Sequence, residues 1–315
     1  MEGYDLIIIG GGPAGLSAGL YAARRNLKVL VLSETLGGQM ALAPSVENYP
    51  GSEPMSGLKL AENIKRQAEK FGCEFKLAKV VSLDLKGDVK KVKTPEKEYS
   101  AKTIIIATGS HYRKLEAEGE DKFIGRGISY CAVCDMPLFK GKKVAVIGGS
   151  DTAVRSAIYA SEIASETYLI HRRDQLRAEE VNQKKLEKAK IKIIWNSVVE
   201  KINGDKFVKK IIIKNVNTNE KTELAVDGVF IEVGEVPTTE IVKTAGIEIN
   251  EKNFIKVNEN FETNLPGVFA AGDATGSFAQ IVVAAAEGAE AATNAYLFIK
   301  GGVYGEKRPD YGEKK

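Results

Sequence analysis

Two hydrophobic runs that lead into glycine-rich turns predict two strand–turn–helix units. The first run covers Tyr4–Ile9 and leads into Gly10–Gly15, and the second covers Lys143–Ile147 and leads into Gly148–Ala153. Each run is short and rich in β-branched residues, as expected of a buried parallel strand, and an alanine-rich helical sequence follows each turn. The repeated pattern predicts two nucleotide-binding domains of the Rossmann type.

The order of the segments predicts that one domain interrupts the other. The tail resumes the character of the first domain, with an apolar strand at Val268–Ala271 and a helix over 281–299. We therefore expect an α/β fold of two Rossmann-like domains with three-layer ββα/βα architecture. The first domain would comprise residues 1–111 and 240–315, and the inserted domain residues 112–239.

The first glycine motif, Gly10-x-Gly12-x-x-Gly15, stands where a dinucleotide-binding fingerprint must stand, after a strand and at the start of a helix. Its glycines would let the backbone approach a pyrophosphate, and the helix N-terminus would add N–H donors. Glu34, at the end of the second strand, is placed to meet a ribose hydroxyl. The alternative is a glycine-rich turn that serves only helix–strand packing.

The second glycine motif is less regular, because Ser150 takes the place of the second glycine. Its second strand ends in a cluster of basic residues instead of an acidic residue. Guanidinium groups pair with a 2′-phosphate, so the cluster predicts NADPH over NADH. The alternative is a solvated basic start of a helix. The residues assigned to this site are Gly148, Gly149, Ser150, Asp151, Thr152, His171, Arg172, Arg173 and Arg177.

Cys131 and Cys134 form a C-x-x-C pair that is followed by Asp135. This spacing fits a redox disulfide or half of a zinc site. The remaining cysteine and the two histidines lack paired spacing, so we expect no metal. Two packed core cysteines remain the third alternative. Asp135 is a candidate proton donor or acceptor for thiolate chemistry, or else a helix cap.

Composition narrows the class of protein. The chain has 315 residues, 43% of them hydrophobic and 28% charged, with a net charge of +3 and three cysteines. These values exclude a disordered chain and a disulfide scaffold, and no basic block suggests nucleic acid. The uncharged stretch Leu6–Ala23 contains glycines and a proline and follows acidic residues, so a strand, turn and helix explain it better than a membrane anchor. We expect a cytoplasmic protein.

Together these motifs resemble the low-molecular-weight thioredoxin reductases, within the FAD- and NADPH-dependent pyridine nucleotide-disulfide oxidoreductases. The resemblance runs from Tyr4 to about Lys300, and C-x-x-C-D just before the second nucleotide fold is its most specific element. It implies that residues 1–111 and 240–315 bind FAD and that residues 112–239 bind NADPH. The FAD residues it implies are Gly10, Gly12, Pro13, Ala14, Gly15, Glu34, Gly38, Gln39, Asn48, Ala107, Thr108, Gly109, Gly272, Asp273 and Gln280.

The resemblance also implies a mechanism. NADPH would give a hydride to FAD, and the reduced flavin would reduce a Cys131–Cys134 disulfide. Cys134 would lie next to the flavin, Cys131 would attack the disulfide of thioredoxin or a thioredoxin/glutaredoxin-like protein, and Asp135 would serve as the acid. The inserted domain would rotate between two states, and the protein would be a homodimer.

Several positions differ from the residues that are usual in the low-molecular-weight thioredoxin reductases. Alternatives on the same fold are a donor other than NADPH, such as reduced ferredoxin or a deazaflavin, and a small-molecule dithiol oxidase. The retained basic cluster favours NADPH and counts against the oxidase, and the intact C-x-x-C-D counts against a passive flavin-binding module. The departures are Met136, Ser150, Arg155, Ser156 and Ala279.

Overall fold

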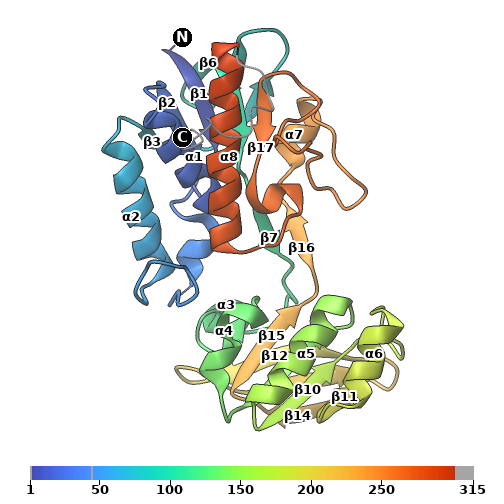
Figure 1. Ribbon diagram of the computed structural model, residues 1–315. Coiled ribbons are helices and arrows are strands. Elements are labelled where there is room, and N and C mark those ends of the chain that lie inside the picture. Colours follow the sequence, from blue (N-terminus) through green and yellow to red (C-terminus); the bar gives the residue numbers. More distant parts are fainter. Residues whose placement is uncertain (1, 44, 302–315) are drawn as a thin grey trace, which may run out of the picture. The chain divides into compact units, whose positions relative to one another are not determined.

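The computed structural model describes residues 2–43 and 45–301, which divide into two compact units (Figure 1). Unit 1 comprises Met1–His111 and Val236–Lys315, and unit 2 comprises Tyr112–Glu235. One unit is therefore inserted into the other. The second division lies four residues before the boundary expected from the sequence, because the outgoing and returning segments pair with each other as strands β7 (Ser110–Tyr112) and β16 (Glu235–Pro237).

Unit 1 is built on a mixed sheet in the strand order β3-β2-β1-β6-β5-β4, with β17 also paired to β6. The strands β1, β2, β3, β6 and β17 pair in parallel, whereas β4 and β5 add an antiparallel extension. The elements of unit 1 are β1 (Glu2–Ile9), α1 (Pro13–Ala23), β2 (Val29–Ser33), the 3-10 turn η1 (Gly38–Leu42), α2 (Gly57–Glu69), β3 (Glu74–Leu77), β4 (Ser82–Asp84), β5 (Lys90–Lys93), β6 (Glu98–Ile106), α7 (Glu240–Thr244), β17 (Val268–Ala270), η3 (Gly272–Thr275) and α8 (Ile281–Lys300).

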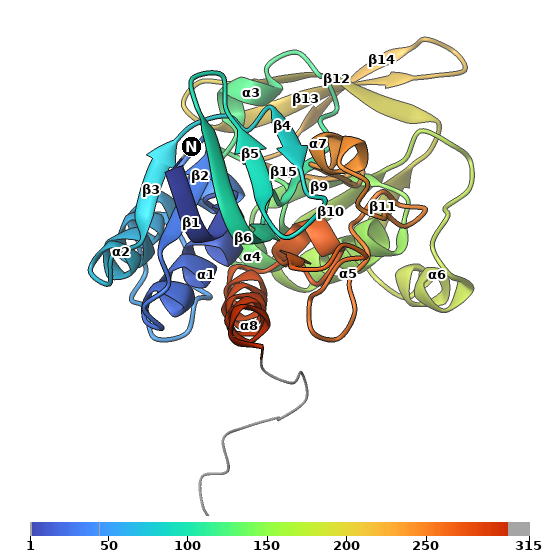
Figure 2. The ribbon, with the colours of Figure 1, turned by 90° about the horizontal axis from the view of Figure 1, so that it is seen from above.

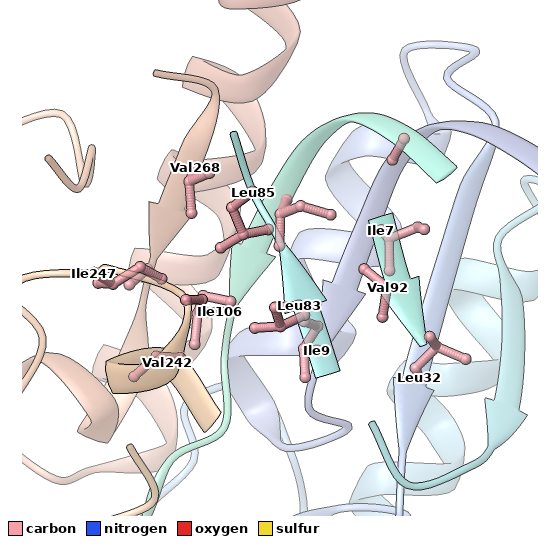
Figure 3. Close-up of a cluster of buried hydrophobic side chains, with 14 of the residues drawn as sticks. Ile7, Ile9, Leu32, Leu83, Leu85, Val92, Ile106, Val242, Ile247 and Val268 are labelled. Atoms are coloured by element: carbon pink, nitrogen blue, oxygen red, sulfur yellow. The ribbon is translucent and has the colours of Figure 1, made fainter. Parts of the chain in front are cut away.

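Alternation along β1 separates two layers of core. Ile7 and Ile9 pack with Leu83, Val92 and other apolar residues on the face covered by β4 and β5 (Figure 3). Leu6 belongs to the cluster on the other face, which α1 and α8 cover mainly with alanines (Figure 2). The period-two pattern of a strand is the physical reason, since successive side chains point to opposite faces.

Unit 2 repeats the plan with a parallel sheet in the order β11-β10-β9-β15-β8. A separate antiparallel sheet, β12-β13-β14, shares a core with one face, and α5 and α6 contribute to the core of the other. The elements of unit 2 are α3 (Glu120–Phe123), β8 (Ile128–Ser129), α4 (Ala132–Asp135), η2 (Met136–Phe139), β9 (Lys143–Gly148), α5 (Asp151–Ile163), β10 (Glu166–Ile170), α6 (Glu180–Glu187), β11 (Ile191–Ile194), β12 (Ser197–Gly204), β13 (Val208–Asn215), β14 (Lys221–Ala225) and β15 (Gly228–Glu232).

The predicted α/β class with two Rossmann-like units is confirmed, as are the strands that open each unit and the helix over 281–299. Observed strands β1 and β9 differ from the predicted ranges by at most two residues. Within residues 2–43 and 45–301, no helix combines the length and the apolar character needed to cross a membrane.

Candidate active site

The first glycine turn is so closely packed that two of its residues must be glycine. Gly10 has a φ of +117°, and a Cβ atom there would overlap the carbonyl oxygen of Ala107 at the end of β6. A Cβ atom at Gly15 would overlap the carbonyl oxygen of Gly10. These contacts bring β1, β6 and α1 together, so the turn has a structural role whatever it binds.

Gly12 differs from its neighbours, because a Cβ atom there would meet nothing within 4 Å. It is the N-cap of α1, and no side chain caps the helix. The first N–H groups of a helix carry a partial positive charge and bind anions such as a pyrophosphate. The space beside Gly12 and the uncapped helix therefore fit a dinucleotide.

The hydroxyl of Ser33 holds this turn in place, a contact that the sequence analysis missed. It accepts a hydrogen bond of 2.8 Å from the Gly11 N–H and donates one of 2.7 Å to the carbonyl oxygen of Thr35. Next to it, the side chain of Glu34 is 62% exposed and forms an exposed ion pair of 3.8 Å with Lys79. Such pairs contribute little, so the carboxylate can exchange this partner for a ribose hydroxyl.

Segments far apart in the chain meet within unit 1, and one of them meets the first glycine turn. Gly38, in η1, approaches Gly12, and a Cβ atom there would lie 3.5 Å from the Gly12 Cα. The amide of Asn48 donates to Gln280, 232 residues away, at 3.3 Å. Gln39 donates to the carbonyl oxygen of Ser110, while its own buried Oε1 has no hydrogen-bond partner among the described residues. A bound polar ligand would satisfy such an atom.

Gly272, which with Asp273 follows β17 after one residue, approaches the turn as well. Gly272 has a φ of +75°, its N–H donates to Glu287 at 2.7 Å, and a Cβ atom there would lie 2.9 Å from the Ala14 Cβ. Asp273 is half-buried in η3. The sequence analysis missed Glu287 and also Gly288, where a Cβ atom would overlap the Ala14 carbonyl oxygen. A glycine inside a helix lowers its stability by about 1 kcal/mol relative to alanine. A glycine within this alanine-rich helix could therefore have indicated a close contact at position 288.

Alanine substitutions at Gly12 and Gly15 are expected to have different effects. Gly12→Ala should lower the free energy of unfolding of the flavin-free protein by no more than about 1 kcal/mol, the cost of alanine at an N-cap. It should weaken FAD binding at least about tenfold, since the methyl group enters the space beside the helix N-terminus. Gly15→Ala should lower the free energy of unfolding by about 1–3 kcal/mol through overpacking. Calorimetric unfolding and FAD titration measure the two effects. Equal FAD affinity in Gly12→Ala and the wild type would contradict the assignment.

The second glycine turn, in unit 2, is packed as closely as the first. Part of the packing comes from a side chain and not from the backbone. A Cβ atom at Gly148 would overlap the carbonyl oxygen of Glu232, and one at Gly149 would overlap the imidazole of His171. The carbonyl oxygen of Gly149 also accepts a hydrogen bond of 2.7 Å from the N–H of Arg177. The turn is thereby joined to the end of β10 and to the basic segment that follows it.

His171 is 5% exposed, and its Nε2 atom has no hydrogen-bond partner among the described residues. Burial lowers its pKa below the ordinary value, and the charges of Arg173 and Arg177 act in the same direction. The imidazole is therefore neutral near pH 7, and its unpartnered nitrogen can serve a bound polar ligand.

The arginines Arg172, Arg173 and Arg177 are exposed, and the ion pairs found within the described ranges do not involve any of them. Ser150 is the N-cap of α5, a helix of 13 residues, and its side chain makes no capping hydrogen bond. Guanidinium groups that carboxylates do not neutralise, beside an uncapped helix, fit a phosphorylated nucleotide.

Asp151 and Ser156 make contacts that the sequence did not reveal. The carboxylate of Asp151 accepts hydrogen bonds from the N–H of Glu179 at 2.9 Å and from Asn182 at 2.6 Å, and these bonds lower its pKa. It thereby ties α5 to the start of α6. Ser156 is buried and donates to Glu232 at 2.9 Å, whereas Thr152 is exposed.

Cys131 and Cys134 form a disulfide with a Cα–Cα distance of 5.3 Å. Cys131 is the half-buried N-cap of α4, its Sγ accepts a hydrogen bond of 3.2 Å from the Cys134 N–H, and Cys134 is exposed. An exposed disulfide of this spacing is open to thiol–disulfide exchange. Among the described residues, no group of three or more His, Cys, Asp or Glu side chains could hold a metal ion.

The model of the family described as pyridine nucleotide-disulphide oxidoreductase matches residues 4–288. The chain belongs to the pyridine nucleotide-disulphide oxidoreductase family. It is 40% identical over 307 residues to a thioredoxin reductase of Peptoclostridium acidaminophilum, with 94% of this chain and 97% of that protein covered.

Solved structures of thioredoxin reductases are similar to this chain. A thioredoxin reductase from Streptococcus pyogenes superposes with a TM-score of 0.90 at 41% identity, covering 95% of this chain and 99% of that one. A ferredoxin-flavin thioredoxin reductase from Clostridium acetobutylicum superposes with a TM-score of 0.51 at 35% identity, covering 96% and 98% of the two chains.

Within this family member, a buried carboxylate fixes the segment before the disulfide. Glu120 is 3% exposed and accepts hydrogen bonds from the N–H groups of Leu115, at 3.1 Å, and Ala117, at 3.3 Å, and from the hydroxyl of Tyr130, at 2.6 Å. The ring of Tyr130 stacks on that of Tyr112, with centroids 5.1 Å apart and planes 6° from parallel. Tyr130 directly precedes Cys131, so these contacts hold one end of the disulfide loop. Sequence reasoning did not find these contacts, although the hydrogen-bond partners of Glu120 lie within ten residues of it.

Asp135 ends α4 and is half-buried directly after the exposed sulfur. It occupies the N-cap position of η2, as the alternative of a helix cap predicts, although its side chain makes no capping hydrogen bond there. The alternative of two packed core cysteines is wrong, because the pair is oxidised and Cys134 is exposed. The disulfide of this oxidoreductase is a redox centre.

Proposed function

We propose that this protein is a flavin-dependent thioredoxin-disulfide reductase that uses FAD and NADPH and acts on thioredoxin or a similar small redox protein. The observation that carries the proposal is the Cys131–Cys134 disulfide, with Cys131 half-buried and Cys134 exposed, in a chain with two glycine-rich strand–turn–helix units. The names of the relatives support the same substrate.

The two cysteines would perform the exchange with the partner. Reduction of the Cys131–Cys134 disulfide takes up two electrons and yields two thiols. The thiolate of Cys131 attacks the partner's disulfide and forms a mixed disulfide, releasing one thiolate of the partner. The thiolate of Cys134 then attacks Cys131, which restores the Cys131–Cys134 disulfide and releases the partner as a dithiol. Asp135 supplies and takes up the proton that the thiolates exchange.

Unit 1 would hold FAD through its glycine turn, with Glu34 at the ribose, Asp273 at the ribityl chain, and Asn48 and Gln280 beside the flavin ring. Unit 2 would hold NADPH through the turn at 148–152, His171 and the three arginines. When bound, these cofactors supply the hydride and the two-electron carrier that the cysteines cannot provide. The open space beside Gly12 supports this assignment, as do the guanidinium groups, for which no ion pair is found among the described residues.

A second candidate keeps the dithiol chemistry and replaces NADPH by another donor, such as reduced ferredoxin. Its support is Ser150, which puts a side chain at the start of α5, and the similarity to a reductase named for ferredoxin. The unpaired arginines favour NADPH, since neither ferredoxin nor a deazaflavin needs a cluster for a 2′-phosphate.

The donor is tested by anaerobic rapid mixing of the FAD-loaded protein with NADPH and, separately, NADH, followed by addition of thioredoxin. We expect fast loss of flavin absorbance with NADPH, slow loss with NADH, and reoxidation by thioredoxin. If neither nucleotide bleaches the flavin while dithionite does, NADPH is not the donor. If NADPH bleaches the flavin and thioredoxin does not reoxidise it, thioredoxin is not the substrate.

We also propose a homodimer in the cytoplasm, which the resemblance to thioredoxin reductases supports. Sedimentation velocity of the FAD-loaded protein tests the dimer, and a single species with the mass of one chain would contradict it.

A further inference from the structure

Trp195 is the single tryptophan of the chain, and it follows β11 directly at the end where the strands of unit 2 open toward ligands. Its side chain is 36% exposed. In parallel α/β sheets, ligands bind outside the carboxyl ends of the strands. Strands β9, β10 and β11 are neighbours, so the residues that follow them lie along one edge: Gly149, His171 and Trp195.

Backbone hydrogen bonds place Trp195 beside the basic segment. The N–H of His171 donates to the carbonyl oxygen of Ile194 at 2.9 Å, and the N–H of Asn196 donates to the carbonyl oxygen of Arg173 at 3.2 Å. The backbone at Trp195 therefore runs beside the segment that carries the arginines.

The ring itself is held at an angle to the imidazole. The ring centroids of His171 and Trp195 lie 6.3 Å apart with planes 78° from parallel, and the same imidazole covers Gly149. Asn196 follows directly in the left-handed region, with a φ of +50°. The hydroxyl of Ser197 donates to the carbonyl oxygen of Trp195 at 2.8 Å. The aromatic surface is thus positioned before any ligand arrives.

We propose that Trp195 is the platform on which the adenine ring of the dinucleotide stacks. The inference rests on the proposed use of NADPH. The arginines can bind the phosphate on the ribose, but the adenine attached to that ribose is flat and largely apolar. A partly exposed indole supplies the matching surface, because the π-face of a base stacks on an aromatic side chain. In the competing interpretation, Trp195 only packs against His171.

Because the chain has a single tryptophan, the FAD-loaded wild-type protein reports stacking by its own fluorescence. Titration with 2′,5′-ADP under tryptophan-selective excitation should quench this fluorescence to saturation. Inorganic pyrophosphate and nicotinamide mononucleotide, which lack adenine, should not quench it. Calorimetry of each ligand gives affinities that do not depend on the fluorescence.

Variants separate stacking from structural support. Trp195→Ala should weaken 2′,5′-ADP binding about tenfold or more, and Trp195→Phe by no more than about threefold, because phenylalanine keeps a flat aromatic face. Neither should alter the affinity for pyrophosphate. The matched control is Phe207→Ala, which removes a 62%-exposed aromatic from the same unit and should leave all affinities unchanged.

The outcomes distinguish this inference from the proposed function. If 2′,5′-ADP binds, but without quenching and equally well to Trp195→Ala, the stacking role is overturned while NADPH use stands. If Trp195→Phe weakens binding as much as Trp195→Ala, the flat face is not what matters and the inference also fails. If neither 2′,5′-ADP nor NADPH binds the wild type, both proposals are wrong: NADPH as the donor and Trp195 as the residue on which adenine stacks.

Discussion

Replacing Cys131 by serine is expected to abolish turnover of thioredoxin while NADPH still reduces the bound flavin at the wild-type rate. The structure joins Cys131 only to Cys134 as a disulfide, and a serine hydroxyl cannot form or exchange one. We expect kcat with thioredoxin to fall below about one-thousandth of the wild-type value. The two cysteines act as one redox pair, so the loss of either removes the activity of both. Steady-state turnover checks the loss of thioredoxin reduction, and anaerobic flavin bleaching on the same preparation checks that NADPH still reduces the flavin.

Cys134→Ser should lose turnover to the same extent, since the remaining thiol could form a mixed disulfide but could not resolve it. Cys73→Ala is the matched control. That thiol is 5% exposed, and burial raises its pKa to about 12, so it is not a nucleophile near neutral pH. Sustained turnover in either active-site variant would contradict the dithiol mechanism.

Removing the arginines of unit 2 is expected to erase the preference for NADPH over NADH. Arg172, Arg173 and Arg177 are exposed, and no carboxylate is paired with them in the described ranges, so each is available to a 2′-phosphate. A hydrogen bond to a charged group contributes about 1.5–3 kcal/mol. A single Arg173→Ala change should raise KM for NADPH about tenfold or more, and the triple alanine variant further, with KM for NADH unchanged.

Steady-state kinetics with both nucleotides measure the effect of the arginines. Arg66→Ala, an exposed arginine of α2 in unit 1, is the control and should leave both KM values unchanged. An equal rise of KM for NADPH and NADH would mean that the arginine cluster does not recognise the 2′-phosphate. No change in either would favour a donor other than NADPH.

Much of the fold followed from local pattern. The strands that open each unit and the helix over 281–299 lie where the periodicity predicted them, because burial of a strand or a helix face imposes its own period on the residues. Gly10 and Gly15 could be predicted from the sequence for a similar reason, because the glycine motif that contains them is a turn of only a few residues. The pair Cys131 and Cys134 was recognisable by spacing, and the structure joins it as a disulfide. The cofactor roles of individual residues remain predictions.

Contacts between distant segments were decided by tertiary structure alone. No local pattern couples Asn48 to Gln280, Gly288 to Ala14, or Tyr112 to Tyr130, because these pairs meet only when helices and strands pack. The same holds for the second division of the chain, which pairing between β7 and β16 moved by four residues from the expected boundary.

The sequence by itself thus determined the α/β class, the two strand–turn–helix units that open with glycine-rich turns, and the C-x-x-C spacing of the cysteine pair. These features rest on interactions within a turn, a strand or a helix, which neighbouring residues dictate. Only the tertiary structure placed the ring of His171 over Gly149 and Trp195 beside it, and turned Asp151 toward α6. Those positions depend on which strand ends become neighbours in the sheet, and long-range packing sets that neighbourhood.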